Sequence, residues 1–212
     1  MEPNILLYFV KYPTLGEVKT RLAKTVGDRE AAKLYRDLVE KNLKVMMPLY
    51  QQKICDLAIV FDPPEKGNGF KSWLALSCGY FPQSVGDLGE RLSFAFHVAF
   101  EQGGRRVMAL GSDTLGLTTD IIQQGFEALH SHDVVVGPAE DGGYYLIGLS
   151  HFQPKLFEGI AWSTSEVLPQ TYKAISNLRL SYQTLCPLED LDEMKIAPPR
   201  WGREEEYDYF VT

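Results

Sequence analysis

The sequence predicts an α/β fold: a mostly parallel, Rossmann-like sheet with helices on both faces. Unbroken apolar runs at 5–10, 56–62, 105–113 and 133–138 are typical of strands that are buried on both sides. The segments between these runs carry apolar residues at three- and four-residue steps, which is the spacing of helices. Strands and helices that alternate in this way favour a parallel sheet between two helical layers.

The helical segments have recognisable ends. A helix is expected to begin at Asp28 and to stop at Pro48, since proline disrupts a helix interior. Another is expected from Asp87 to about Gln102, because Asp87-x-x-Glu90 has the capping-box form. A further helix is expected near 118–130, and further strands are expected at "YYLIGL" and 181–188.

Composition narrows the class of protein. The chain has 212 residues, of which 45% are hydrophobic, so we expect one domain over 1–212 with a sizeable core. The net charge of −7 argues against nucleic acid as the main partner, although a local basic pocket would still bind phosphate.

The cysteines and the first residues indicate a cytoplasmic protein. Cys55, Cys78 and Cys186 are scattered, without the close spacing of a metal site, and fit a reducing compartment. The apolar run near the start is too short for a signal sequence or a transmembrane segment. Nothing in the sequence indicates an oligomeric state.

Unusual residues follow the strands, where ligands gather in such sheets. The loop after the first strand carries Lys11, Gly16, Lys19, Thr20 and Arg21 in a protein that is acidic overall. Lysine and arginine are the residues that hold phosphate oxygens, so this loop is a candidate phosphate site. The G-x-x-x-x-G-K-[ST] spacing of a P-loop is missing, and a solvated turn that leads into a helix is the alternative.

Carboxylates follow two later strands. Asp113 ends "GSD", and a carboxylate there is well placed to hold a divalent cation such as Mg²⁺. The alternative is that Asp113 caps a following turn or helix. Asp190 and Asp192 form a spaced acidic pair after the last strand, which is equally common on surfaces.

"GPAEDGGYYLIGL" places acid beside two glycines. Gly142 and Gly143 let the backbone pass close to a ligand or take a conformation closed to other residues. Asp141 would then act on a hydroxyl as a general base or as a hydrogen-bond acceptor, whereas Glu140 would point the other way from an extended segment. A tight turn with solvated carboxylates is the alternative.

"AWSTSEVL" predicts a helix start near Thr164, because Ser163 and Glu166 have capping-box spacing. Trp162 lies just before it, where its ring would lie against a sugar or a base. A hydrophobic staple between Trp162 and Val167 is the alternative.

Six motifs together resemble a known family. They are, in order, FVKYPTLGEVKTRLA, GDLGERL, GSD, GPAEDGGYYLIGL, WSTSEVL and LEDLDE. The chain resembles a bacterial family of small glycosyltransferase-like proteins with the GT-A, or nucleotide-diphospho-sugar transferase, fold. That family is related to 2-phospho-lactate guanylyltransferase and to molybdopterin-guanosine nucleotidyltransferases. Two departures stand out: Thr114-Leu115 replaces the family's Cys-Pro, and "GSD" is not a full D-x-D.

The resemblance implies a nucleotide ligand, either a nucleotide-diphosphate sugar or an NTP, held with Mg²⁺ or Mn²⁺. It implies site residues in four groups. The phosphates would be held by Lys11, Gly16, Lys19, Thr20 and Arg21; the base or ribose by Gln83, Gly86 and Asp87; the metal by Asp113, Asp190 and Asp192; and the acceptor or sugar by Asp141, Gly142, Gly143, Trp162 and Thr164. Lys19 and Asp141 are the candidate catalytic residues.

Three functions are compatible with these residues. The first is metal-dependent transfer of a sugar from a nucleotide-diphosphate sugar. The second is nucleotidyl transfer of a guanylyl or cytidylyl kind with release of pyrophosphate. Both develop negative charge on a phosphate leaving group, so one cationic loop and metal would serve either. The third is a nucleotide-sugar-binding protein without catalysis.

Overall fold

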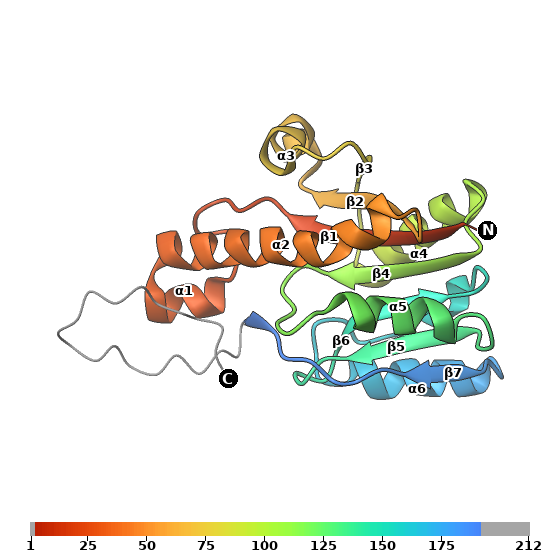
Figure 1. Ribbon diagram of the computed structural model, residues 1–212. Helices are drawn as coiled ribbons and strands as arrows, with labels where there is room; N and C mark the ends of the chain where they lie inside the picture. The colour runs from red at the N-terminus through yellow and green to blue at the C-terminus, as the bar shows by residue number, and fades with distance from the viewer. Residues whose placement is uncertain (1–2, 192–212) are drawn as a thin grey trace.

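The computed structural model describes residues 3–191 and contains one seven-stranded sheet, shown in Figure 1. The strands lie in the order β3-β2-β1-β4-β6-β5-β7. Their bounds are β1 Asn4–Lys11, β2 Asp56–Asp62, β3 Gly79–Pro82, β4 Arg106–Gly111, β5 Val134–Pro138, β6 Tyr144–Leu149 and β7 Tyr182–Thr184. The α-helices are α1 Thr20–Val26, α2 Asp28–Gln51, α3 Gly67–Leu74, α4 Leu88–Glu101, α5 Thr119–Ala128 and α6 Val167–Asn177, and the 3₁₀ helices are η1 Pro64–Lys66 and η2 Pro154–Phe157.

The sheet is mostly parallel, as predicted. β1 pairs in parallel with β2 and β4, and β2 with β3. β6 runs antiparallel to β4 and β5, and β7 returns parallel to β5. The strand order reverses between β1 and β4, which makes their carboxyl ends the topological switch point where such sheets bind ligands.

Helices bury both faces of the sheet, and each face has its own core (Figure 1). On one face α2 and α5 pack against the sheet through side chains such as Leu38 and Ile122. On the other, α4, η2 and α6 contribute Phe96, Phe157 and Ile175. Strands covered on both sides must be apolar along their whole length, which explains the unbroken apolar runs.

The helix that begins at Asp28 was expected to stop at Pro48, and that expected end is wrong. α2 continues to Gln51 and contains Pro48. The proline lies in the last turn, and its carbonyl oxygen still accepts the bond from the Gln52 N–H that closes the helix. A proline in the last turn removes one N–H donor from a helix that is already ending, so it does not stop the helix at once.

The expected start near Thr164 is three residues early, since α6 begins at Val167. Ser163 has a φ of 63°, a left-handed conformation that no helix continues through. Instead of a capping box, the Thr164 hydroxyl donates to the Ala161 carbonyl at 2.7 Å and accepts from the Glu166 N–H at 3.2 Å.

The Asp87 capping box is confirmed. The Asp87 carboxylate accepts from the Glu90 N–H at 2.9 Å, and the Glu90 carboxylate accepts from the Asp87 N–H at 2.8 Å. This fixes the start of α4 at the carboxyl edge of the sheet, directly after β3.

The helices within residues 3–191 include none with the length and apolarity needed to cross a membrane.

Candidate functional site

The loops that follow the two strands at the switch point each contribute one charged side chain to a contact between them. Lys19 follows β1, and its Nζ lies 2.6 Å from Oδ2 of Asp113, which follows β4. The Lys19 side chain is only 7% exposed, whereas that of Asp113 is 40% exposed. One residue predicted to hold phosphate and one predicted to hold the metal therefore meet at this point.

Local packing holds Lys19 in this position. Val18 and Leu22 on either side are each 4% exposed and anchor the loop in the core. Lys19 itself has a φ of 48° and immediately precedes α1. This left-handed conformation costs energy for a residue with a side chain, and such strain is concentrated at functional sites.

Polar side chains of α2 hold the turn that carries Asp113. The Tyr35 hydroxyl accepts from the Lys11 N–H at 3.0 Å and shares a 2.8 Å hydrogen bond with Ser112 Oγ. Seven residues on, on the same side of the helix, Asn42 donates to the Thr114 carbonyl at 3.0 Å. Burial raises the pKa of Tyr35 well above its usual value, so the hydroxyl stays neutral. We call these contacts the α2 clamp.

The acidic pair predicted near the end of the chain lies partly at this turn. Asp190 forms a backbone bridge with Thr114, and the Leu191 N–H donates to the Asp113 carbonyl at 2.9 Å. Asp190 is thus held beside Asp113. Asp192 lies outside the residues that the structure describes.

The donor set at this edge suits a hard divalent cation. Asp113 already holds a cationic group, the Lys19 ammonium, and the backbone of Asp190 pairs with that of Thr114, the residue after Asp113. Mg²⁺ is usually bound through one or two carboxylates together with substrate phosphates. Over residues 3–191 no group of three or more His, Cys, Asp or Glu side chains is placed to hold a metal alone. These residues therefore fit a metal that arrives with a phosphate ligand.

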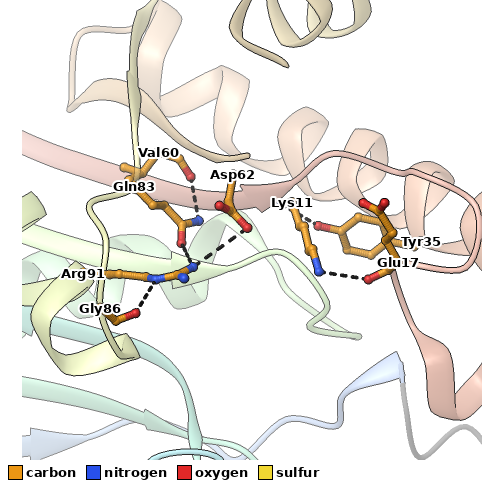
Figure 2. Close-up of polar contacts among 8 residues, drawn as sticks. All are labelled: Lys11, Glu17, Tyr35, Val60, Asp62, Gln83, Gly86 and Arg91. Carbon is orange, nitrogen blue, oxygen red and sulfur yellow. Dashed lines mark hydrogen bonds and ion pairs between the residues drawn. The ribbon is translucent and has the colours of Figure 1, made fainter. Parts of the chain in front are cut away.

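The rest of the first loop is more open. The Lys11 ammonium donates to the Glu17 carbonyl at 2.9 Å, as Figure 2 shows, and so closes the loop on itself. Gly16 has a φ of 75°, and Thr20 and Arg21 are exposed. Of the five residues predicted to hold phosphate, only Lys19 reaches Asp113.

Arg91 on α4 joins the residues predicted to meet the base or ribose (Figure 2). Its Nη1 donates to Gln83 Oε1 at 3.2 Å and lies 3.8 Å from Oδ2 of Asp62 at the end of β2. Its Nε donates to the Gly86 carbonyl at 3.1 Å. Gln83 in turn donates to the Val60 carbonyl at 3.2 Å.

Sequence reasoning missed Asp62 and Arg91. Asp62 is the last residue of β2, and Asp113 comes two residues after the end of β4. A carboxylate at a strand end, the signal that pointed to Asp113, was therefore also available for Asp62. Asp87, which was included, uses its carboxylate to cap α4.

The predicted acceptor segment is a turn between β5 and β6, so the extended form assumed for Glu140 and Asp141 is wrong. Asp141 accepts from the Gly143 N–H at 2.8 Å and is exposed. Gly142 has a φ of 91°, and a Cβ there would lie 2.6 Å from the Ser165 carbonyl oxygen. Gly142 is therefore explained by close packing against the segment before α6, without a ligand.

Trp162 packs within the protein, and because α6 begins at Val167 the staple register given as the alternative does not hold. Its ring meets that of Tyr144 edge to face with centroids 6.4 Å apart. A Cβ on Gly89 of α4 would lie 2.6 Å from Trp162 Nε1, so a flat ring does fill the space beside this glycine. Thr164 is exposed and its hydroxyl stays within its own turn.

Two hollows border α4. The larger, about 700 Å³, runs between α4 and residues 152–159 and is lined by Asp87, Gly89, Glu90, Ser93, Phe94, His97, Phe152, Pro154, Phe157, Glu158 and Gly159. Its lining includes no Lys or Arg, so its charge does not suit a phosphate. The smaller, about 80 Å³, is lined by Gly111, two residues before Asp113. We take the Lys19–Asp113 contact, not the larger hollow, as the centre of the site.

Solved structures share this fold. A protein of Desulfovibrio desulfuricans G20 that is provisionally assigned as a nucleotide-diphospho-sugar transferase is 37% identical, with a TM-score of 0.85 over 91% of this chain and 83% of that one. Two further structures are similar in fold alone. Glucosyl-3-phosphoglycerate synthase from Mycobacterium tuberculosis, in complex with Mn²⁺, UDP and glucosyl-3-phosphoglycerate, is 10% identical, with a TM-score of 0.57 over 89% of this chain and 71% of that one. CMP:2-keto-3-deoxy-manno-octonic acid synthetase with CTP is 9% identical, with a TM-score of 0.52 over 87% and 89%.

These likenesses confirm the predicted fold, that of nucleotide-diphospho-sugar transferases. No curated protein matches the chain. A family model described as "Uncharacterized protein conserved in bacteria (DUF2064)" matches residues 46–164, more than half of the chain. The chain belongs to this family.

Proposed function

We propose that this protein is a metal-dependent glycosyltransferase that moves a sugar from a nucleotide-diphosphate sugar to an acceptor. The observation that carries the proposal is the 2.6 Å contact between Lys19 and Asp113 across the switch point of the sheet. The 37% identity to a protein provisionally assigned as a nucleotide-diphospho-sugar transferase supports it.

Lys19 would act on the leaving group. Negative charge builds on the β-phosphate as the bond to the sugar breaks, and a nearly buried ammonium stabilises that charge more than an exposed one does. The α2 clamp holds the Asp113 turn beforehand, so little reorganisation is needed when the substrate binds. Arg21 and Lys11 border the same loop and would attract the diphosphate.

Asp113, with Asp190 beside it and Asp192 two residues on, would hold Mg²⁺ or Mn²⁺. Such an ion neutralises phosphate charge and orients the leaving group. When substrate and ion bind, Asp113 would exchange its contact with Lys19 for one with the ion. The Lys19 ammonium would then contact the phosphates.

The remaining residues would place the two ends of the substrate. Gln83 and Gly86, held by Arg91 and Asp62, would meet the base or ribose. Asp141 is exposed on the β5–β6 turn and would accept the proton of the attacking hydroxyl. Trp162 would line the sugar side of the crevice through its contact with Tyr144.

Nucleotidyl transfer is the second candidate. The fold likeness to CMP:2-keto-3-deoxy-manno-octonic acid synthetase spans 89% of that chain, so the two folds have nearly the same extent, which supports this candidate at the level of the fold. The same cation and carboxylates would then act on pyrophosphate as the leaving group.

A thermal-shift panel separates these functions. UDP-, GDP-, CDP- and dTDP-sugars and the four NTPs are each added with Mn²⁺, because a ligand that binds the native state raises its melting temperature. We expect one nucleotide sugar to stabilise more than its NTP, and then to release nucleoside diphosphate in a turnover assay. Stabilisation by an NTP alone, with pyrophosphate release, would replace glycosyl transfer by nucleotidyl transfer. Binding without turnover, unaffected by Asp141→Asn, would indicate a binding protein.

A further inference from the structure

The larger hollow, of about 700 Å³ between α4 and residues 152–159, has no part in the proposed function. Its volume lies in the range of pockets that hold small molecules. Several residues of its lining are exposed, so a ligand can reach them: Glu90, Phe94, His97, Glu158 and Gly159. What the hollow would bind follows from the two kinds of side chain that line it.

Phenylalanine rings form one part of the lining. Phe157 is 4% exposed, and its ring stacks on that of Phe96 in the core with centroids 5.5 Å apart. Phe152 is half-buried. Phe94, by contrast, is 46% exposed and is the one phenylalanine among the exposed large hydrophobic residues of 3–191. The hollow thus offers an aromatic surface on which an apolar group would lose its contact with water.

Carboxylates form the other part, and no lysine or arginine lines the hollow. Asp87 and Glu90 are held by their capping box, in which each carboxylate accepts a backbone N–H through one of its oxygens. A carboxylate has two oxygens, so each group can still accept a hydrogen bond from a ligand. Glu158 adds an exposed carboxylate from the facing segment. The start of α4 carries about half a positive charge, so the three carboxylates leave the hollow negative.

This combination favours one class of ligand. An anion would be repelled by the carboxylates. A metal ion would need side chains that converge, and within residues 3–191 no group of three or more His, Cys, Asp or Glu is placed to hold one. An uncharged ligand would use the rings but would leave the negative charge unbalanced. An organic cation uses both parts, because the face of an aromatic ring also attracts an ammonium group.

We propose that this hollow is a binding site for an organic amine, with its protonated nitrogen at the carboxylates and an apolar body on the phenylalanine rings. The nitrogen carries N–H groups, since these donate charge-assisted hydrogen bonds to carboxylate oxygens that a quaternary ammonium cannot donate. The site goes beyond the proposed function, and its existence does not depend on it.

One end of the hollow lies at the carboxyl edge of the sheet, where α4 begins. A Cβ on Gly89 would lie 2.6 Å from both the Phe157 carbonyl oxygen and Trp162 Nε1, so the lining adjoins the tryptophan proposed to border the sugar. In the proposed transfer, an amine bound here that also carries a hydroxyl would be the acceptor. That role, unlike the binding itself, rests on the proposed function.

The test compares two probes that have the same apolar body and differ in charge. 2-Phenylethylamine, which is a cation at neutral pH, and 2-phenylethanol, which is uncharged, are titrated without nucleotide, and their dissociation constants are measured by ligand-observed NMR. We expect the amine to bind about tenfold more tightly or better, and this preference to shrink as salt is added, because salt screens exposed charges. Equal affinity for the two probes, or no binding of the amine, would overturn the proposal.

Two variants of α4 locate the effect. Glu90→Gln keeps an oxygen that can cap the helix and removes the charge, so it should reduce the preference for the amine about threefold or more. Glu101→Gln is the matched control, because it removes an exposed carboxylate of the same helix outside the lining, and the preference should be unchanged. An unchanged preference in Glu90→Gln, or equal losses in both variants, would overturn the proposal. Binding of the amine by a protein that no nucleotide stabilises would instead count against the proposed function alone.

Discussion

The two sides of the switch point, which we call its walls, are built in different ways. On the α2 side, buried polar groups are joined to one another: Tyr35 bonds to Lys11 and Ser112, and Asn42 to Thr114. On the α4 side the wall is aromatic and aliphatic, and the buried Tyr144 hydroxyl has no partner within residues 3–191. The α2 side is joined by hydrogen bonds, although Thr114 Oγ1 there is also buried without a partner among residues 3–191, and the α4 side is held mainly by apolar packing.

This difference indicates how the two walls divide the work. Phosphate and metal chemistry needs groups fixed in advance, since preorganised charge is what lowers a barrier. The α2 clamp supplies that rigidity next to Lys19 and Asp113. The apolar α4 side offers shape to an uncharged group instead. The predictions below test each wall in turn.

Asp113→Asn should have the largest effect. The amide cannot carry the charge that Asp113 shares with Lys19 and would share with a metal, so we expect Mn²⁺ affinity in the presence of nucleotide to fall about a hundredfold, roughly 2.7 kcal/mol. Electron paramagnetic resonance of free Mn²⁺ measures this titration. Asp120→Asn, which removes an exposed carboxylate at the start of α5, is the control. An unchanged titration would remove Asp113 from the metal site.

Lys19→Ala comes next. The loss of a nearly buried ammonium beside the diphosphate should raise the nucleotide dissociation constant more than tenfold, about 1.4 kcal/mol or more. Calorimetric titration with the nucleotide that stabilises most is the measurement. Lys24→Ala, on the exposed side of α1, should change the constant little. Equal effects in the two variants would make the first loop a general basic surface rather than a site.

The sequence predicted the sheet better than it predicted the site. β1, β2, β4, β5 and β6 were predicted because strands buried on both faces are apolar along their length, and this pattern can be recognised within each strand alone. The short β3 and β7 and the helices α1 and α3 lack such a run or a capping pattern, and of these only β7 was expected, over a longer range.

The site depends on contacts that periodicity does not encode. The meeting of Lys19 and Asp113 joins residues 94 positions apart and follows from the strand order, which the sequence alone did not give. Tyr35 and Asn42 looked like parts of an ordinary amphipathic helix, because a buried polar residue is identified only by its partner. Gly142 seemed to mark a ligand, but Ser165 fills the space above it.

Tyr35→Phe should destabilise the fold. The change leaves Ser112 Oγ and the Lys11 N–H without their partner in a buried place, which costs about 1–3 kcal/mol. Urea denaturation gives the free energy of unfolding, and the slope with denaturant should not change. A loss below about 0.5 kcal/mol would mean that water replaces the hydroxyl, and that the clamp is not a rigid unit.

Tyr144→Phe should have the smallest effect on stability, although it too removes a buried hydroxyl oxygen, here from a ring that is only partly buried. Without a partner in the native state, the hydroxyl pays for its loss of water and gains nothing in return, so its removal should leave the free energy of unfolding unchanged within about 0.5 kcal/mol or raise it. The same urea titration, run beside Tyr35→Phe, measures the difference between the walls. A loss of 1 kcal/mol or more would show that Tyr144 already has a partner in the unliganded protein, such as ordered water, and the two walls would then be alike.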